Sequence, residues 1–148
     1  MRDLDAIKRQ ARQRAEQMNL GYAGALRPSE AHALMQAGAK LVDVRTRAEL
    51  DFVGRIPGSM FIEWNSYPEG RRNPGFLSQL ASAVGKDVPV MFLCRSGNRS
   101  HAAAIAATQA GWGECYNILE GFEGDPDENQ HRNTVGGWKV TGLPWVQG

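Results

Sequence analysis

The 148 residues carry a net charge of +1, with 42% hydrophobic and 22% charged side chains, values that are ordinary for one globular domain. So small a net charge favours neither nucleic acid nor an acidic surface as a partner. No segment approaches the roughly 20 apolar residues of a membrane span. The charged first 19 residues also lack the apolar stretch of a secretory signal, and the two cysteines suit a reducing compartment. We therefore expect a cytoplasmic protein without a membrane partner.

Apolar residues recur at three- and four-residue steps near the N-terminus, which is typical of an amphipathic helix that docks on the main body. The apolar stripe consists of Leu4, Ile7, Ala11, Ala15 and Met18. Charged residues that fall mainly off the stripe are predicted to face solvent, namely Arg9, Arg12, Arg14 and Glu16. We expect an N-terminal helix with its connection over residues 1–24 and a single domain over residues 25–148.

Short apolar runs alternate with helical patterns from Arg27 onward. The apolar runs predict strands at 41–44, 59–64, 90–93 and 115–119, and the helical patterns predict helices at 29–37, 48–52, 74–84 and 100–110. Ser29 is the expected N-cap of the first helix in this series, and Gly38 is its expected terminator. Strands separated by helices pair in parallel, so we predict an α/β fold whose central sheet is flanked by helices on both faces.

The aromatic residues Trp64, Tyr67, Trp138 and Trp145 are expected to serve packing rather than base stacking.

Cys94 stands where the strand at 90–93 ends, and such ends are where sites form in parallel sheets. A loop that leads into a helix N-terminus collects unpaired backbone N–H groups and the positive end of the helix dipole, which stabilise an anion. Arg95 and Arg99 flank the thiol, and Gly97 and Asn98 tolerate the left-handed backbone angles that a curled loop needs. We therefore predict that Cys94 is a thiolate nucleophile.

Three ordered blocks resemble the single-domain rhodaneses, a thiosulfate sulfurtransferase-like family. They are LVDVRTRAELDFVGRIPGSMFIEW, the CRSGNRS loop, and YNILEGFEG followed by GWKVTGLPW. The resemblance implies a rhodanese-like three-layer sandwich that moves a sulfane sulfur through a persulfide on Cys94, without a cofactor. It also implies a small anionic donor such as thiosulfate, and cyanide, a thiol or a protein as the sulfur acceptor. The persulfide loop would consist of Arg95, Ser96, Gly97, Asn98, Arg99 and Ser100, with Asp43 and Arg45 in support and Ser100 beginning the helix.

The sequence departs from the family in three places. Arg55 stands where a histidine is usual, and the frequent double glycine after the last strand is here Gly121-Phe122-Glu123-Gly124. A polar excursion over residues 125–137 then delays the final tryptophan, either as part of the rim of the site or as a plain surface loop. Glu49 is expected to be structural.

Two other functions stay open beside sulfur transfer with turnover. One is a sulfur-carrier or protein-binding module with little turnover of its own. The other is a cysteine phosphatase or arsenate reductase. The loop of those enzymes resembles a cysteine, five residues and then an arginine, whereas only four residues separate Cys94 from Arg99, which disfavours this function. Cys115 is most simply a core residue, although a resolving disulfide with Cys94 is the alternative. The three histidines lack ligand spacing, and residues 125–136 lack the glycine and the glutamate of a calcium loop, so no metal site is predicted.

Overall fold

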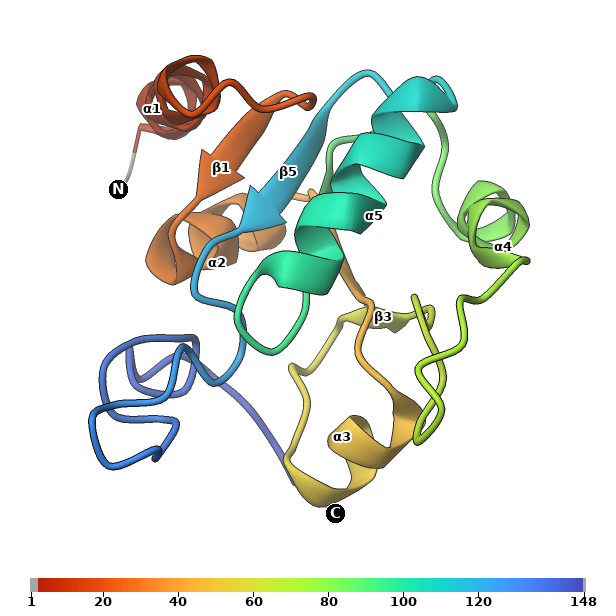
Figure 1. The fold of residues 1–148 in the computed structure, drawn as a ribbon. Helices are drawn as coiled ribbons and strands as arrows, with labels where there is room; N and C mark the ends of the chain where they lie inside the picture. The colour runs from red at the N-terminus through yellow and green to blue at the C-terminus, as the bar shows by residue number, and fades with distance from the viewer. Residues whose placement is uncertain (1–2, 148) are drawn as a thin grey trace.

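A sheet of five parallel strands in the order β1-β5-β4-β2-β3 forms the centre of the molecule (Figure 1) in a computed structural model that describes residues 3–147. The strands are β1 (Gly24–Leu26), β2 (Lys40–Asp43), β3 (Met60–Phe61), β4 (Val90–Leu93) and β5 (Cys115–Ile118). β4 is central and buried along its whole length, which is why its sequence is a continuous apolar run. The expected parallel α/β sheet is confirmed.

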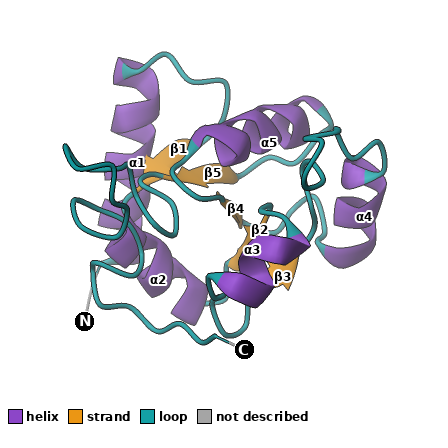
Figure 2. Ribbon diagram, turned by 60° about the horizontal axis from the view of Figure 1, so that its bottom comes forward, coloured by secondary structure: helices purple, strands orange, loops and turns teal. Residues whose placement is uncertain are grey.

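Helices cover both faces of this sheet, as Figures 1 and 2 show. They are α1 (Leu4–Gln17), α2 (Pro28–Gln36), α3 (Arg47–Phe52), α4 (Phe76–Ala83) and α5 (Asn98–Gln109). Side chains from α4 and α5 build one hydrophobic core with alternate residues of the strands, and α1 and α2 build a second core on the other face. The predicted three-layer sandwich is therefore confirmed.

The N-terminal helix docks by its stripe, with Ile7, Ala11 and Ala15 buried. The predicted stripe is wrong at its end, because Met18 caps the helix and is 54% exposed. The prediction that Arg14 faces solvent is also wrong. Its guanidinium makes two hydrogen bonds of 2.6 and 2.9 Å to the carboxylate of Glu30 and a third, of 2.9 Å, to the Ala25 carbonyl. Arg14 thereby ties α1 to β1 and α2.

Several predicted boundaries shift in the structure. Helix α2 starts at Pro28 with Arg27 as its N-cap instead of Ser29, because the Glu30 carboxylate accepts the Arg27 N–H at 2.8 Å. Helix α5 starts at Asn98 instead of Ser100. The strand predicted over residues 59–64 pairs as a regular strand only at Met60–Phe61, and β1 is an additional strand without a sequence-based prediction.

The chain beyond β5 folds back over the carboxyl end of the sheet as loops and turns. Trp138 is fully buried there, and Val146 forms an antiparallel bridge with Arg55 near the C-terminus of α3. The packing prediction is wrong for Tyr67, which is 70% exposed, whereas Trp64 is buried. Within residues 3–147, no helix has the length and apolar character needed to cross a membrane.

Candidate active site around Cys94

Cys94 follows β4 directly, and the loop after it returns to the thiol before α5 begins. The Gly97 N–H donates a hydrogen bond to Cys94 Sγ at 3.1 Å, and Ser100 Oγ lies 3.3 Å from the same sulfur. Gly97 caps α5 with φ +115°, a conformation that disfavours any residue with a Cβ. The sulfur is thus held by a peptide N–H and a hydroxyl at the positive end of a 12-residue helix.

Asn117 connects these two contact groups. Ser100 Oγ donates to Asn117 Oδ1 at 2.5 Å, and Asn117 Nδ2 donates to the Gly97 carbonyl at 3.2 Å. Asn117 lies in β5, next to β4, and is 3% exposed. No motif in the sequence points to this residue, although a single amide inside a buried apolar strand is a signal that its side chain has a partner.

The segment after β5 closes the loop from the other side. The N–H of Phe122 donates to the Cys94 carbonyl at 2.9 Å, and the N–H of Glu123 donates to the Arg95 carbonyl at 3.0 Å. Gly121 makes this approach possible, since a Cβ there would lie 2.5 Å from the Cys94 carbonyl oxygen, and its φ is +66°. The backbone carbonyls at the start of the loop are therefore bonded to the N–H groups of residues 122–124.

Arg99 is held by a carboxylate from another helix. Its guanidinium makes two hydrogen bonds, of 2.7 and 2.9 Å, to Glu49 of α3. Glu49 also accepts from the N–H and the hydroxyl of Thr46, which caps α3. Burial by itself raises the pKa of Glu49, but the hydrogen bonds from Arg99 and Thr46 lower it to about 2. A large part of the Arg99 charge is thus already balanced within the protein.

Asp43 and Arg45 form a fully buried ion pair behind the loop, with 2.7 Å between Asp43 Oδ2 and Arg45 Nη2. Arg45 also donates to the Gly54 carbonyl at 2.8 Å, and its guanidinium lies 4.2 Å from the centre of the Phe122 ring. Arg45 therefore contacts the segments that frame the loop and Asp43 holds Arg45, and neither has a hydrogen bond to the thiol among the described residues.

Two hollows flank the loop. One, of about 430 Å³, lies between α3, the turn at 65–70 and the excursion after β5, and its charged lining residues are Glu49, Arg95, Arg99, Glu123 and Arg132. The other, of about 310 Å³, is lined by Ser96, Gly97 and Asn98 of the loop and by side chains such as Tyr22 and His101. The predicted loop residues thus come together around Cys94, and they line hollows on two different sides of the loop.

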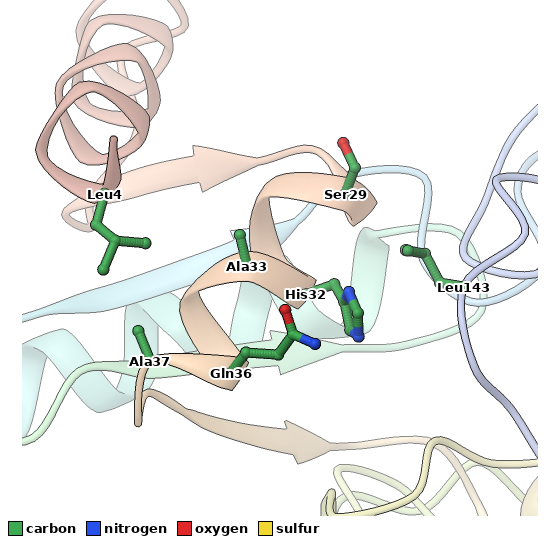
Figure 3. A pocket seen from close by; sticks show the side chains of 7 residues that line it. All are labelled: Leu4, Ser29, His32, Ala33, Gln36, Ala37 and Leu143. Atoms are coloured by element: carbon green, nitrogen blue, oxygen red, sulfur yellow. The ribbon is translucent and has the colours of Figure 1, made fainter. Parts of the chain in front are cut away.

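A larger hollow of about 640 Å³ lies away from this site, on the outer side of α2 (Figure 3). Leu4, Ala33 and Leu143 line it together with Ser29, His32 and Gln36, and the ring of His32 packs edge-on against Trp138. Its lining includes neither a cysteine nor an arginine. Cys94 therefore stays the candidate nucleophile.

Cys115 cannot resolve a disulfide within the same chain. The strand register sets Cys115 opposite Val90, four residues before Cys94. At about 3.3 Å per residue this is a separation of about 13 Å along the sheet, well beyond the limit of roughly 7 Å between disulfide-linked Cα atoms. Cys115 is fully buried, and its burial raises the pKa of the thiol. It is a core residue.

The part of the chain that the structure describes holds no cluster of three or more histidine, cysteine, aspartate or glutamate side chains that could bind a metal ion. Asp127, the second acidic residue of the calcium-like pattern, accepts hydrogen bonds from the N–H groups of Asn129 and His131 and from the Thr134 hydroxyl.

Known proteins resemble this chain in both sequence and structure. A crystal structure of Rv0390 from M. tuberculosis superimposes with a TM-score of 0.78 at 43% identity, covering 86% of this chain and 99% of that chain. An uncharacterized protein of Rickettsia rickettsii, the RP600 homolog, is 42% identical over 113 residues, which are 72% of this chain and 82% of that protein. The thiosulfate sulfurtransferase GlpE of Pseudomonas aeruginosa is 31% identical over 96 residues, 65% of this chain and 77% of that protein.

Residues 27–125 match the family model described as Rhodanese-like domain. This match covers β2 through β5 and the whole loop around Cys94. Together with the parallel sheet and the similarity to a thiosulfate sulfurtransferase, it assigns the chain to the rhodanese-like domain family.

Proposed function

We propose that this protein is a sulfurtransferase in which Cys94 takes a sulfane sulfur from a small anionic donor, such as thiosulfate, and passes it to cyanide or a thiol. The observation that carries the proposal is the position of Cys94 Sγ, 3.1 Å from the Gly97 N–H and 3.3 Å from Ser100 Oγ at the N-terminus of α5. This environment favours a negatively charged sulfur, both as a thiolate and as the longer persulfide.

The reaction would take place in two displacements at sulfur. The Cys94 thiolate attacks the outer sulfur of thiosulfate, a sulfur–sulfur bond forms, and the original sulfur–sulfur bond breaks with its electron pair leaving on sulfite. The acceptor then attacks the outer sulfur of the persulfide. Cyanide leaves as thiocyanate and a thiol leaves as a persulfide, and both routes restore the Cys94 thiolate. These are the same steps as in thiol–disulfide exchange, in which the better leaving group departs.

The hollow beside Arg95 and Arg132 supports an anionic donor. Arg95 is exposed at the mouth, and Arg132 of the excursion donates to the Gly124 carbonyl at 2.6 Å. Because Glu49 already binds Arg99, these two arginines are the more available positive charges in the lining. The volume of about 430 Å³ exceeds what thiosulfate needs, so a larger thiol or a residue of a partner protein can also enter as the acceptor.

The engagement of Arg99 argues against a phosphatase. An enzyme that cleaves phosphate esters uses the arginine of its loop to bind the phosphoryl oxygens. Arg99 follows Cys94 after only four residues, and both of its bonded nitrogens donate to Glu49.

The proposal is tested by mass spectrometry after incubation with thiosulfate. We expect the protein to gain the mass of one sulfur atom, to lose it with a reducing agent and to release thiocyanate when cyanide is added. Cys94→Ser should gain nothing, and Cys115→Ser, the matched control, should behave like the wild type. Repeated turnover with cyanide distinguishes an enzyme from a sulfur carrier that is loaded only once. Release of phosphate from phosphate esters without any sulfur loading would contradict the proposal.

A further inference from the structure

The amide that bridges the two contact groups of Cys94 lies in the same hollow as a tyrosine–histidine pair. The hydroxyl of Tyr22 is hydrogen-bonded to Nδ1 of His101 at 2.7 Å, and the two rings pack edge-on with their centres 5.4 Å apart. Burial raises the pKa of Tyr22, and the neighbouring Asn117 amide partly offsets this effect. Tyr22, His101 and Asn117 line the same hollow beside the loop, and Asn117 is hydrogen-bonded to Ser100, whose Oγ contacts the sulfur of Cys94.

The direction of these hydrogen bonds gives Asn117 a definite role. The amide oxygen accepts from the Ser100 hydroxyl and the amide nitrogen donates to the Gly97 carbonyl. A reversed amide would place its NH₂ group against the Ser100 hydroxyl and its oxygen against the Gly97 carbonyl, so the observed orientation is the one that satisfies both neighbours. One buried side chain thus positions both the Ser100 oxygen and the Gly97 peptide that contact the sulfur.

Tyr22 brings the N-terminal segment into this arrangement. It lies in the connection between α1 and β1, before the residues 27–125 that match the family model. The tyrosine is 7% exposed, and it lines the hollow of about 310 Å³ together with Gly97 and Asn117. The segment before the matched region therefore contacts the side of the loop that faces away from the arginine-lined hollow.

We propose that Asn117 is a positioning residue for the Cys94 nucleophile, and that Tyr22 of the N-terminal connection, paired with His101, holds Asn117 in place. The proposal rests on the proposed function in assigning Cys94 as the nucleophile. It adds that residues outside the loop set how well the loop stabilises the thiolate. It also gives the connection within residues 1–24 a part in the active site.

The test is the rate at which iodoacetamide alkylates Cys94 across neutral to alkaline pH, with mass spectrometry to separate Cys94 from Cys115. In Asn117→Asp, the introduced carboxylate repels both the thiolate and the Gly97 carbonyl and competes more strongly for the Ser100 proton. Alkylation at neutral pH should therefore slow by roughly tenfold, with the pH profile moved to higher pH. Asn73→Asp is the matched control, since Asn73 also donates to a carbonyl and accepts a backbone N–H, but its side chain lines neither hollow at Cys94.

Tyr22→Phe separates positioning from charge, because it removes only a hydroxyl. We expect its alkylation rate at neutral pH to fall roughly threefold, with circular dichroism showing an intact fold. A purely structural role would lower the thermal stability of the variants and leave the pH profile of Cys94 where it is. If Tyr22→Phe, or a folded Asn117→Asp, alkylates with the wild-type profile, the proposal is wrong. Alkylation needs no sulfur donor, so this result is independent of whether thiosulfate loads the protein.

Discussion

The ion pair between Glu49 and Arg99 links α3 to α5 across the mouth of the site, and its contribution to stability can be measured with Glu49→Gln. The glutamine keeps the shape of the side chain but lacks the charge. Both partners are mostly buried, with 19% of the Glu49 side chain and 23% of the Arg99 side chain exposed. Breaking such a pair leaves a guanidinium partly buried without its counter-charge, so the variant should be clearly less stable than the wild type.

The pKa of Glu49 sets the magnitude. A pKa lowered from the ordinary value of 4.5 to about 2 corresponds to about 3.4 kcal/mol of stability, at about 1.36 kcal/mol per pH unit. Because about a fifth of each side chain meets water, we expect Glu49→Gln to lower the free energy of unfolding at neutral pH by about 2–3 kcal/mol.

The sign of the pH dependence follows from the lowered pKa. The carboxylate stabilises the folded state fully above its unfolded pKa, and this contribution is lost as the pH falls through the folded pKa of about 2. A protonated Glu49 resembles glutamine, so the wild type and the variant should converge in acid. At about pH 3 the wild type should have lost about 2 kcal/mol relative to Glu49→Gln.

Urea unfolding followed by tryptophan fluorescence at several pH values measures this difference, because Trp64, Trp112 and Trp138 are buried. Asp51→Asn is the control, since Asp51 pairs with Arg47 on the same helix but is half exposed, and it should change stability by less than about 0.5 kcal/mol. A stability gap that stays constant down to about pH 3, or no gap at neutral pH, would refute the assignment.

Four further substitutions test other contacts, each by thermal or urea unfolding. Gly121→Ala should cost more than about 4 kcal/mol because its Cβ would meet backbone atoms at 2.5 Å. Gly97→Ala, whose Cβ would meet no atom nearer than 3.9 Å, should cost only about 1–3 kcal/mol from its positive φ, and equal costs would count against the clash. Arg14→Met should lower the free energy of unfolding by about 2–3 kcal/mol because it leaves the buried carboxylate of Glu30 without its positive partner. An unchanged unfolding midpoint would contradict this. Asp43→Asn should lower the free energy of unfolding by about 3–5 kcal/mol because its guanidinium partner is fully buried, and a loss below about 1 kcal/mol would contradict this role of the ion pair.

The elements that carry the site were predictable because they rest on local signals. The apolar run of β4 and the glycine before α5 can be read from neighbouring residues, and they place Cys94 correctly at the end of a central strand. The start of α5 was predicted two residues late because Gly97, in a left-handed conformation, caps the helix without a side-chain hydrogen bond.

What the sequence did not reveal depends on contacts between distant segments. β1 consists of three residues, two of them small, and it is a strand only because β5 pairs with it and α1 packs over it. Arg99 and Glu49 are fifty residues apart in sequence. Asn117 reaches the loop because its strand, β5, lies next to β4 in the sheet. Such partnerships have no periodicity in sequence, so the engagement of Arg99 and the role of Asn117 could not be predicted from spacing.

The pairing of β1 with β5 also determines when this protein can fold during synthesis. β1 leaves the ribosome early, but its strand partner follows about ninety residues later, with Gly24 opposite Tyr116. At about 5–20 residues per second, the N-terminal segment waits roughly 5–18 s before it can join the sheet. Asn117 and residues 121–124 are made 23–30 residues after Cys94, so the thiol is synthesised roughly 1–6 s before the groups that enclose it. A nascent chain in an oxidising or thiol-reactive environment is therefore most vulnerable at Cys94 during this interval.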